Sequence, residues 1–280
     1  MNENENLAVT PASSNPYAAP TAVVMTAKVD SADAQFFADG KVVSGGNGAA
    51  WIGSAWNLFK KSPGIWIICF LIQIGISIGL NFVPFIGMFI GILIGPVIAA
   101  GWVVMGALAQ NDEPLDVNQF FAGFQQKAGE LFTVGAIYAG LTILMFIVLG
   151  IIAVSLFGTA IMGIITSGDT SSLEGAALGG SIALMFLLFA AALVGSFLIY
   201  ATTWFAPALI MFHNLTPVDA MKKSFSAFLK NWAAFTILGL VYIGLCIASI
   251  FTLFLGLIVV IPLLLLTTYV SYRDIFTDGQ

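Results

Sequence analysis

Three polar side chains lie at four-residue intervals within one apolar stretch of the chain, namely Gln73, Ser77 and Asn81. This spacing places all three on one face of a helix. In apolar surroundings an amide or a hydroxyl can form a hydrogen bond to a neighbouring helix, or it can line a path for a solute. The sequence leaves both roles open, and helix packing is the simpler interpretation because it needs no ligand.

Lysines that adjoin apolar stretches are candidate lipid contacts: Lys60, Lys61, Lys222, Lys223 and Lys230. A lysine close to an anionic membrane surface contributes about 1 kcal/mol of attraction. These side chains could therefore hold the headgroups of anionic lipids. The alternative is that they only fix the orientation of the protein in the membrane.

The sequence shows no residue pattern that is typical of an active site or a metal site. His213 is the single histidine, and no partner stands at ligand spacing beside it. We therefore expect a water-exposed side chain at His213, no enzyme activity, no cofactor and no metal. Cys69 and Cys246 are predicted to be small buried side chains and not a disulfide. A charge near the centre of a span costs at least about 2.5–3.5 kcal/mol, and none is found there, so a proton relay is not expected.

The composition indicates a membrane protein, because 59% of the residues are apolar and 8% are charged, against roughly 25% charged in soluble proteins. The mean hydropathy is +1.01. About 20 apolar residues in a helix cross the hydrocarbon of a bilayer. We predict an all-α integral membrane protein with six transmembrane helices, at 65–83, 85–108, 131–157, 182–212 and two between 232 and 272. The third and fourth are long enough to tilt or protrude. The last two need a very tight connection near 252–256, and a re-entrant pair is the alternative.

The basic residues give the predicted helices a direction. All nine fall on one side of the membrane when six spans are drawn: Lys28, Lys41, Lys60, Lys61, Lys127, Lys222, Lys223, Lys230 and Arg273. Lys and Arg are retained on the cytoplasmic side during insertion. We therefore expect a multi-pass membrane protein with both termini in the cytoplasm. A nucleic-acid partner is not expected, because there is no basic face to neutralise phosphates.

Three segments of the chain resemble one another and indicate a three-fold repeat: WNLFKKSPGIW from Trp56, FAGFQQKAGELF from Phe121 and FSAFLKNWAAF from Phe225. Each contains two aromatic residues three positions apart, then a lysine, then the start of a span. We interpret them as short amphipathic helices in the cytoplasmic interface, with N-terminal signals at Thr216-Pro217-Asp219 and Glu113-Pro114-Asp116. The second span of each pair contains a proline that predicts a kink: Pro96, Pro207 and Pro262.

The chain divides into three predicted regions. Residues 1–48 are polar and rich in small side chains, so we expect a disordered cytoplasmic tail. Residues 49–276 form the six-span domain, and residues 277–280 form a short cytoplasmic tail. Aromatic residues near the cytoplasmic ends are expected to anchor the protein in the interface: Trp51, Trp56, Trp66, Trp232, Tyr269 and Tyr272.

The segments WNLFKKSPGIW, GPVIAAG, FFAGF and YVSYRDIF resemble an uncharacterised family of bacterial six-helix inner-membrane proteins. The segment APALIMFHNLTPVDAMKKSFSAFLKNW is similar to the polytopic membrane domain of some glycerophosphodiester phosphodiesterases. The resemblance covers residues 49–276 and implies six membrane helices in a bacterial inner membrane. It implies no chemistry, because the motifs are structural and the phosphodiesterase domain itself is not present.

Two functional hypotheses follow from the sequence. The first is a structural or organisational role, without enzyme activity, in which the protein interacts with membrane lipids or with other membrane proteins. The second is a facilitator or channel for a neutral or lipid-like solute, which would use the polar face at Gln73, Ser77 and Asn81. The sequence does not indicate the oligomeric state.

The predicted orientation can be tested with reporter fusions. Alkaline phosphatase is active only outside the cytoplasm, so a fusion at Gly175 is expected to be active and a fusion at Asn118 inactive. The opposite pattern, or labelling of Lys223 from outside intact cells, would contradict the orientation.

Overall fold

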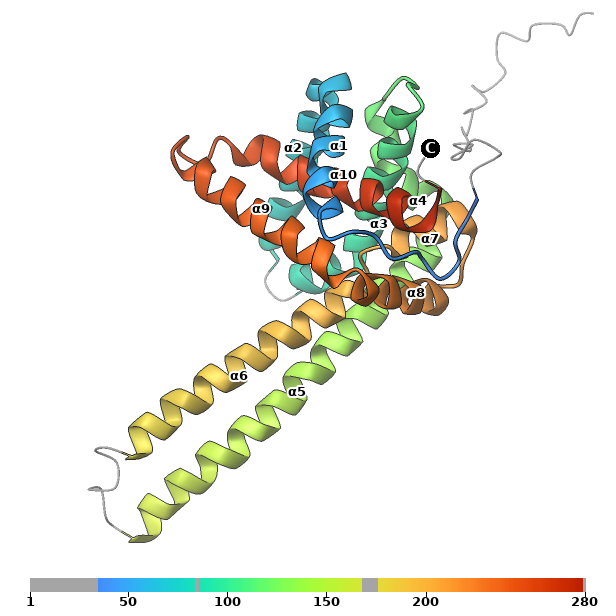
Figure 1. The fold of residues 1–280 in the computed structure, drawn as a ribbon. Helices are drawn as coiled ribbons and strands as arrows, with labels where there is room; N and C mark the ends of the chain where they lie inside the picture. The colour runs from blue at the N-terminus through green and yellow to red at the C-terminus, as the bar shows by residue number, and fades with distance from the viewer. Residues whose placement is uncertain (1–34, 84–85, 168–175, 279–280) are drawn as a thin grey trace, which may run out of the picture.

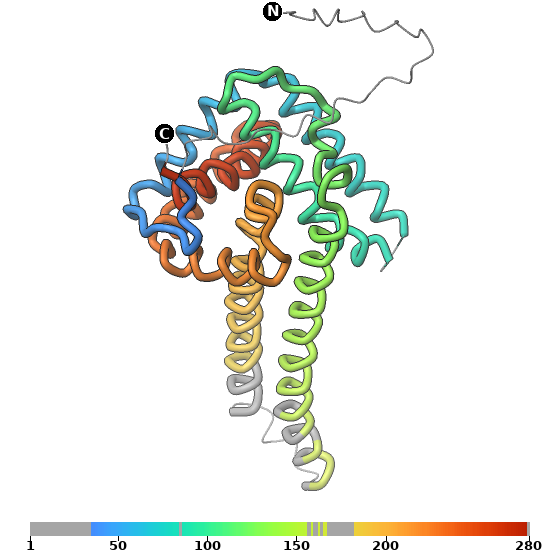
Figure 2. Tube along the Cα trace, turned by 90° about the vertical axis from the view of Figure 1, so that its right-hand side faces the viewer, coloured from blue at the N-terminus to red at the C-terminus, as the bar shows by residue number. Residues whose placement is uncertain are grey.

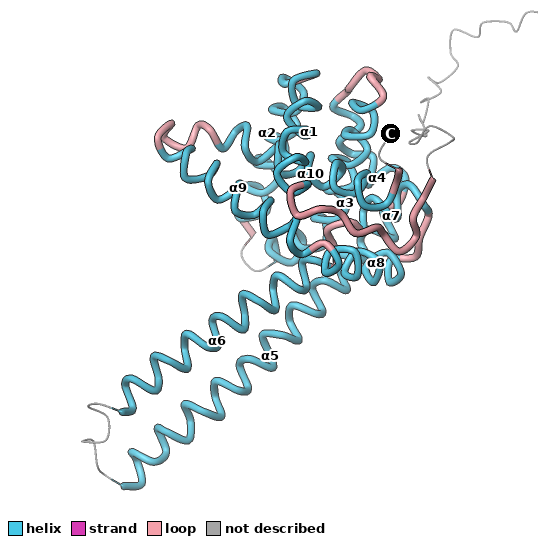
Figure 3. The backbone as a smooth tube through the Cα atoms, in the orientation of Figure 1, coloured by secondary structure: helices cyan, strands magenta, loops and turns pink. Residues whose placement is uncertain are grey.

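The computed structural model describes residues 35–83, 86–167 and 176–278, and in these ranges the chain forms helices and no strand (Figure 3). Figure 1 gives the labels of the helices. In chain order they are α1 Asn47–Lys61, α2 Pro63–Asn81, α3 Ile86–Gln110, η1 Val117–Phe121, α4 Ala122–Gln126, α5 Ala128–Ser167, α6 Ala176–Ala201, α7 Ala206–His213, α8 Pro217–Lys230, α9 Trp232–Ile250 and α10 Leu257–Phe276.

Six helical segments of the described chain are long and apolar enough to cross a membrane. This confirms the predicted all-α, multi-pass membrane fold. The short connection between the last two spans is confirmed as well, because α9 ends at Ile250 and α10 begins at Leu257. This turn is apolar, with Phe251 88% and Leu253 84% exposed.

Helices α5 and α6 form a hairpin that extends away from the other helices. They run side by side toward the lower left of Figure 1, and Figure 2 shows the same pair from a second direction. Helix α5 has 40 residues, which corresponds to about 60 Å, whereas the hydrocarbon of a bilayer is about 30 Å thick. The predicted excess length of the third span is therefore confirmed. The other helices pack together at the base of this hairpin.

The fourth predicted span is broken and not merely kinked. Helix α6 ends at Ala201 and α7 begins at Ala206, because Pro207 has no N–H and its ring excludes the carbonyl four residues earlier. The hydroxyl of Ser224 in α8 repairs the break. It accepts a hydrogen bond from the backbone N–H of Phe205 at 2.9 Å and donates one to the carbonyl of Ala201 at 2.8 Å. Pro96 and Pro262, by contrast, lie inside the continuous helices α3 and α10.

The three repeat units pack against one another in a ring. Helix α1 of the first unit packs against α9 and α10 of the third. The helices η1 and α4 of the second unit pack against α3 of the first, and α8 of the third unit packs against α7, α6 and α5 of the second. Each short helix thus covers the preceding hairpin, which supports the predicted repeat of short helix plus hairpin.

The predicted helix starts are confirmed in one unit and corrected in another. Thr216 caps α8, since its hydroxyl accepts the backbone N–H of Asp219. In the second unit Asp116 is the cap, with Gln119 as its reciprocal partner, and Glu113 lies before the helix. This unit is also not one amphipathic α-helix, because a 3-10 turn, η1, precedes the short α4.

Close backbone contacts hold the ring together. A Cβ atom at Gly101 in α3 would overlap the carbonyl oxygen of Phe120 in η1, and a Cβ atom at Gly48 in α1 would overlap the carbonyl oxygen of Ala234 in α9. Only glycine allows helices to approach this closely. The repeat units therefore contact each other through backbone as well as side chains.

The packed part of the chain begins earlier than predicted. Residues 35–46, which we assigned to the disordered tail, cross the molecule between α8 and the end of α10 (Figure 3). The N–H of Phe37 bonds to the carbonyl of Phe276 at 2.8 Å, and Asn231 bonds through its side chain to the backbone of Val43 and Lys41. We call residues 35–46 the strap. Of the rest of the predicted tail, Asn47 and Gly48 begin α1, and residues 1–34 lie outside the described residues.

Replacement of Gly101 by alanine tests the close contact between α3 and η1. The added methyl group meets a backbone oxygen that cannot rotate away, and such overpacking costs about 1–3 kcal/mol. We expect a lower melting temperature of the purified protein in detergent. Gly140→Ala is the matched control, because a Cβ atom there meets nothing within 4 Å. Equal melting temperatures for the two variants would contradict the contact.

Candidate functional site

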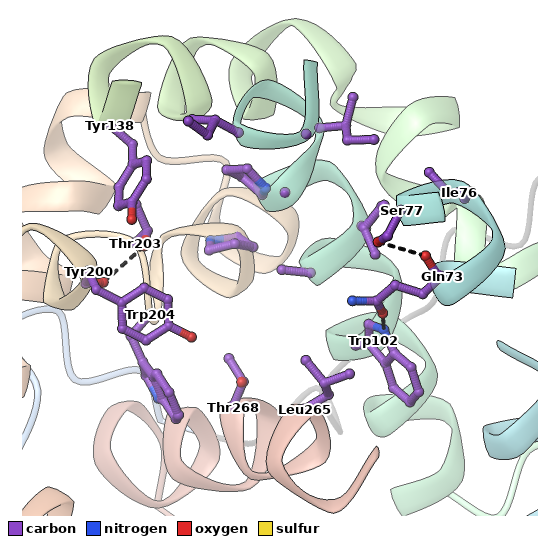
Figure 4. Close-up of a pocket in the computed structure, with 18 of the residues that line it drawn as sticks. Gln73, Ile76, Ser77, Trp102, Tyr138, Tyr200, Thr203, Trp204, Leu265 and Thr268 are labelled. Carbon is purple, nitrogen blue, oxygen red and sulfur yellow. Dashed lines mark hydrogen bonds between the residues drawn. The ribbon is translucent and has the colours of Figure 1, made fainter. Parts of the chain in front are cut away.

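A cavity of about 320 Å³ lies where the three hairpins meet. Figure 4 shows polar and aromatic side chains that converge on it from several helices. Its lining residues have no formal charge: α2 contributes Gln73, Ile76, Ser77 and Leu80; α3 contributes Gly91, Ile92, Ile94, Gly95, Pro96, Ile98, Ala99 and Trp102; the remaining helices contribute Tyr138, Tyr200, Thr203, Trp204, Pro207, Leu265 and Thr268.

Some polar groups of the cavity are bonded and others are not. The side-chain oxygen of Gln73 accepts a hydrogen bond from the indole N–H of Trp102 at 2.8 Å. The amide nitrogen of Gln73 and the hydroxyls of Tyr138, Tyr200 and Thr268 have no hydrogen-bond partner among the described residues. The cavity therefore offers several uncommitted donors and acceptors to a guest molecule.

The basic residues of the described chain lie at the same ends of the six alternating spans, and we call this side of the molecule the basic end. Aromatic packing lies between the cavity and this end. The ring of Trp102 stacks on Trp66 at 5.8 Å and meets the edge of Phe120 at 6.0 Å. Phe205 and Leu209, which lie on either side of Pro207 in the chain, are fully buried as well. Packed side chains thus separate the cavity from the basic end.

Only two of the three residues of the predicted polar face line the cavity. Gln73 and Ser77 both line the cavity, and Gln73 also makes the expected bond to another helix. The hydroxyl of Ser77 donates to the carbonyl of Gln73 in its own helix, and the amide of Asn81 donates to the carbonyl of Ser77. Asn81 does not line the cavity and lies exposed at the end of α2. Gln73 therefore both joins α2 to α3 and lines the cavity.

Sequence reasoning did not find the other polar residues of the cavity, although the repeat contained a signal. Gln73 follows Trp56 by 17 residues, and Tyr138 follows Phe121 by 17 residues. The two side chains thus occupy equivalent places in the first two units and face the same cavity. Tyr200 had no comparable signal, because it depends on the break before α7.

Lys61 is occupied by contacts within the protein. Its ammonium donates to the carbonyl of Ala109 and to the carboxylate of Asp112, both at 2.7 Å. A lysine at this place satisfies a carbonyl of the last turn of α3. It therefore serves the packing of α1 on α3 and is not free for a lipid.

The lysines of α8 divide into two kinds. Lys223 donates to the carboxylate of Asp39 at 3.2 Å, and Lys230 donates to the backbone carbonyl of Asp39 at 3.0 Å. Both hold the strap. Lys222, and Lys60 in α1, have no hydrogen bond or ion pair within the described residues. Of the five lysines predicted to contact lipid, these two remain available.

His213 is not the water-exposed side chain that we predicted. Its ring stacks on Phe36 of the strap with centroids 3.5 Å apart, and its Nε2 lies 2.6 Å from the hydroxyl of Tyr272. The side chain is half-buried. It therefore joins the strap to α10, because the strap covers this end of α7.

The predicted aromatic anchors are mostly core residues. Four of them are almost fully buried: Trp51, Trp66, Tyr269 and Tyr272. Trp56 is 43% and Trp232 66% exposed, as an anchor would be. Tertiary packing therefore buries aromatic residues that the sequence alone predicts to be exposed at the interface.

The two cysteines are unpaired as predicted, but only Cys69 is buried, and Cys246 is exposed.

The fold and the cavity define the class of this chain, which is an all-α, multi-pass membrane protein. Comparisons of the chain with known protein families, curated proteins and solved structures find no match. The resemblance of its motifs to bacterial inner-membrane proteins therefore stays a prediction.

Replacement of Gln73 by leucine tests the bond between α2 and α3. It leaves the indole N–H of Trp102 without an acceptor, and hydrogen bonds between membrane helices contribute about 0.6–1.7 kcal/mol. We expect a lower melting temperature in detergent. Ser77→Ala is the control, because the Ser77 hydroxyl bonds only within its own helix. If both variants melted alike, the bond would not stabilise the fold.

Proposed function

We propose that this protein is a multi-pass protein of a bacterial inner membrane that holds an uncharged, amphipathic molecule within the bilayer, without enzyme activity. The observation that supports this proposal is the cavity, with its unbonded amide and hydroxyl groups. This role takes from the first of the two hypotheses the lack of enzyme activity, and from the second the polar face at Gln73 and Ser77, but it involves no passage of a solute.

The chemistry of the lining favours a neutral guest. Gln73, Tyr138, Tyr200 and Thr268 provide hydrogen bonds, while the remaining lining is largely aliphatic and aromatic. Among the described residues, no charged side chain lines the cavity to compensate a charged guest, and an unpaired charge in such surroundings is strongly disfavoured. The volume of about 320 Å³ falls at the lower end of the roughly 300–1,000 Å³ typical of ligand pockets.

The packing favours retention of the guest over its passage. A facilitator needs a path to both surfaces, and the stack of Trp66, Trp102 and Phe120 closes the basic end. We propose that this end faces the cytoplasm, because Lys and Arg are retained there. Both termini would then be cytoplasmic, and the guest would reach the cavity from the bilayer or from the far side.

The test is the analysis of molecules that travel with the protein in gentle detergent, by mass spectrometry of the extracted complex. We expect an uncharged small molecule on the wild-type protein and little or none on Gly95→Phe, because Gly95 lines the cavity and a Cβ atom there meets open space. Gly140→Phe is the matched control, since Gly140 is open as well but lies outside the cavity.

Two results would contradict the proposal. Equal amounts of the molecule on wild type, Gly95→Phe and Gly140→Phe would place its binding elsewhere. A Ser77→Cys variant, with the native cysteines replaced, that reacts with a membrane-impermeant thiol reagent from both sides of the membrane would indicate passage instead.

A further inference from the structure

A second hollow lies on the side of the molecule, between α5 and α8. It has a volume of about 260 Å³ and is lined by Ile137 and Leu141 of α5, Thr202 of the break, and Val218, Met221, Lys222 and Phe225 of α8. Apart from Thr202 and Lys222, the lining side chains are apolar. We call it the α5–α8 groove. It is separate from the central cavity and shares no lining residue with it.

The groove marks the border between two kinds of surface. Beyond it, α5 and α6 expose large apolar side chains, such as Leu144 at 58% and Phe197 at 54%. On its other side lies α8, which is amphipathic and contains three lysines. Trp232, which is 66% exposed, follows α8 directly, and exposed tryptophans mark the membrane interface. Apolar side chains on one side, and lysines with a tryptophan on the other, are the pattern expected where headgroups meet hydrocarbon.

Lys222 gives the groove one uncompensated positive charge. Its stem lines the groove, and its ammonium has no partner within the described residues, whereas Lys223 and Lys230 of the same helix are bonded to the strap. The nearest acidic residue along α8 is Asp219, whose carboxylate accepts a hydrogen bond from Thr216. The groove thus combines an apolar channel with one cation at its border.

We propose that the α5–α8 groove binds an anionic phospholipid. The phosphate pairs with the ammonium of Lys222, and part of an acyl chain lies against Ile137, Leu141, Met221 and Phe225. A polar peptide side chain is a poorer fit, because the Thr202 hydroxyl is already bonded to the carbonyl of Ile199 at 2.6 Å and most of the lining side chains are apolar. The proposal is independent of the central cavity and its guest.

The experiment compares phospholipid retained by purified wild type, Lys222→Gln and Lys60→Gln, by native mass spectrometry from nanodiscs of equal phosphatidylglycerol and phosphatidylcholine. We expect about fivefold less bound phosphatidylglycerol for Lys222→Gln, the factor that one interfacial lysine provides, and unchanged phosphatidylcholine. Lys60→Gln is the matched control, because Lys60 is also unpaired within the described part of the chain but does not line the groove. It is expected to lose clearly less phosphatidylglycerol than Lys222→Gln does, because its charge is not coupled to the groove.

A second variant tests the apolar part of the site. Leu141→Trp fills the groove while leaving Lys222 in place, and we expect it to lose bound phosphatidylglycerol as Lys222→Gln does. Equal losses in Lys60→Gln and Lys222→Gln would show unspecific attraction and overturn the proposal. Unchanged retention in Lys222→Gln, or in a folded Leu141→Trp variant, would overturn it as well. Gly95→Phe is expected to keep its phosphatidylglycerol, so the two sites can be judged separately.

Discussion

A backbone polar group in apolar surroundings must be paired, and this constraint governs the structure of the protein. A helix satisfies its own backbone, so each span tolerates lipid on most sides. The break between α6 and α7 is the exception, because Pro207 interrupts the hydrogen bonds of the fourth span. Ser224 supplies both a donor and an acceptor there. That single hydroxyl fixes α8 against the break, and α8 in turn supports the strap and one side of the groove.

The ring of repeat units has the same physical basis. Each short helix covers a neighbouring hairpin at the basic end, where glycine lets backbone meet backbone. Close packing is possible there because the contact residues Gly48 and Gly101 have no side chain. The far parts of the hairpins expose many apolar side chains, although Gly87 in the first turn of α3 also meets the backbone of Leu80 in α2. The protein is thus densely packed at one end, and the cavity lies at the point where that packing gives way to diverging hairpins.

Hydropathy and charge were sufficient to predict the six spans, their unequal lengths and the repeat, because each of these features depends on local sequence. The central site was predicted only through Gln73 and Ser77. Its other polar groups come from α5, α6 and α10, and their convergence depends on tertiary packing. For the same reason His213 and Tyr272 were predicted to lie at the interface, whereas Phe36 of the strap stacks on His213 and Tyr272 is buried in the core. A role for Asp39 was not predicted either, although its carboxylate accepts a hydrogen bond from Lys223 and its backbone carbonyl accepts one from Lys230.

The unequal reach of the hairpins affects the area that the protein occupies in a bilayer. Helices α9 and α10, of 19 and 20 residues, match the thickness of the hydrocarbon, whereas α5 is about twice as long. If α5 remains within the hydrocarbon, its axis must lean by about 60° from the bilayer normal. A helix that leans so far has an elongated cross-section in the plane of the membrane, and it occupies different lateral positions in the two leaflets. The lipids beside it must shorten, spread or order their chains, so the lateral footprint of the protein is larger than six upright helices would require.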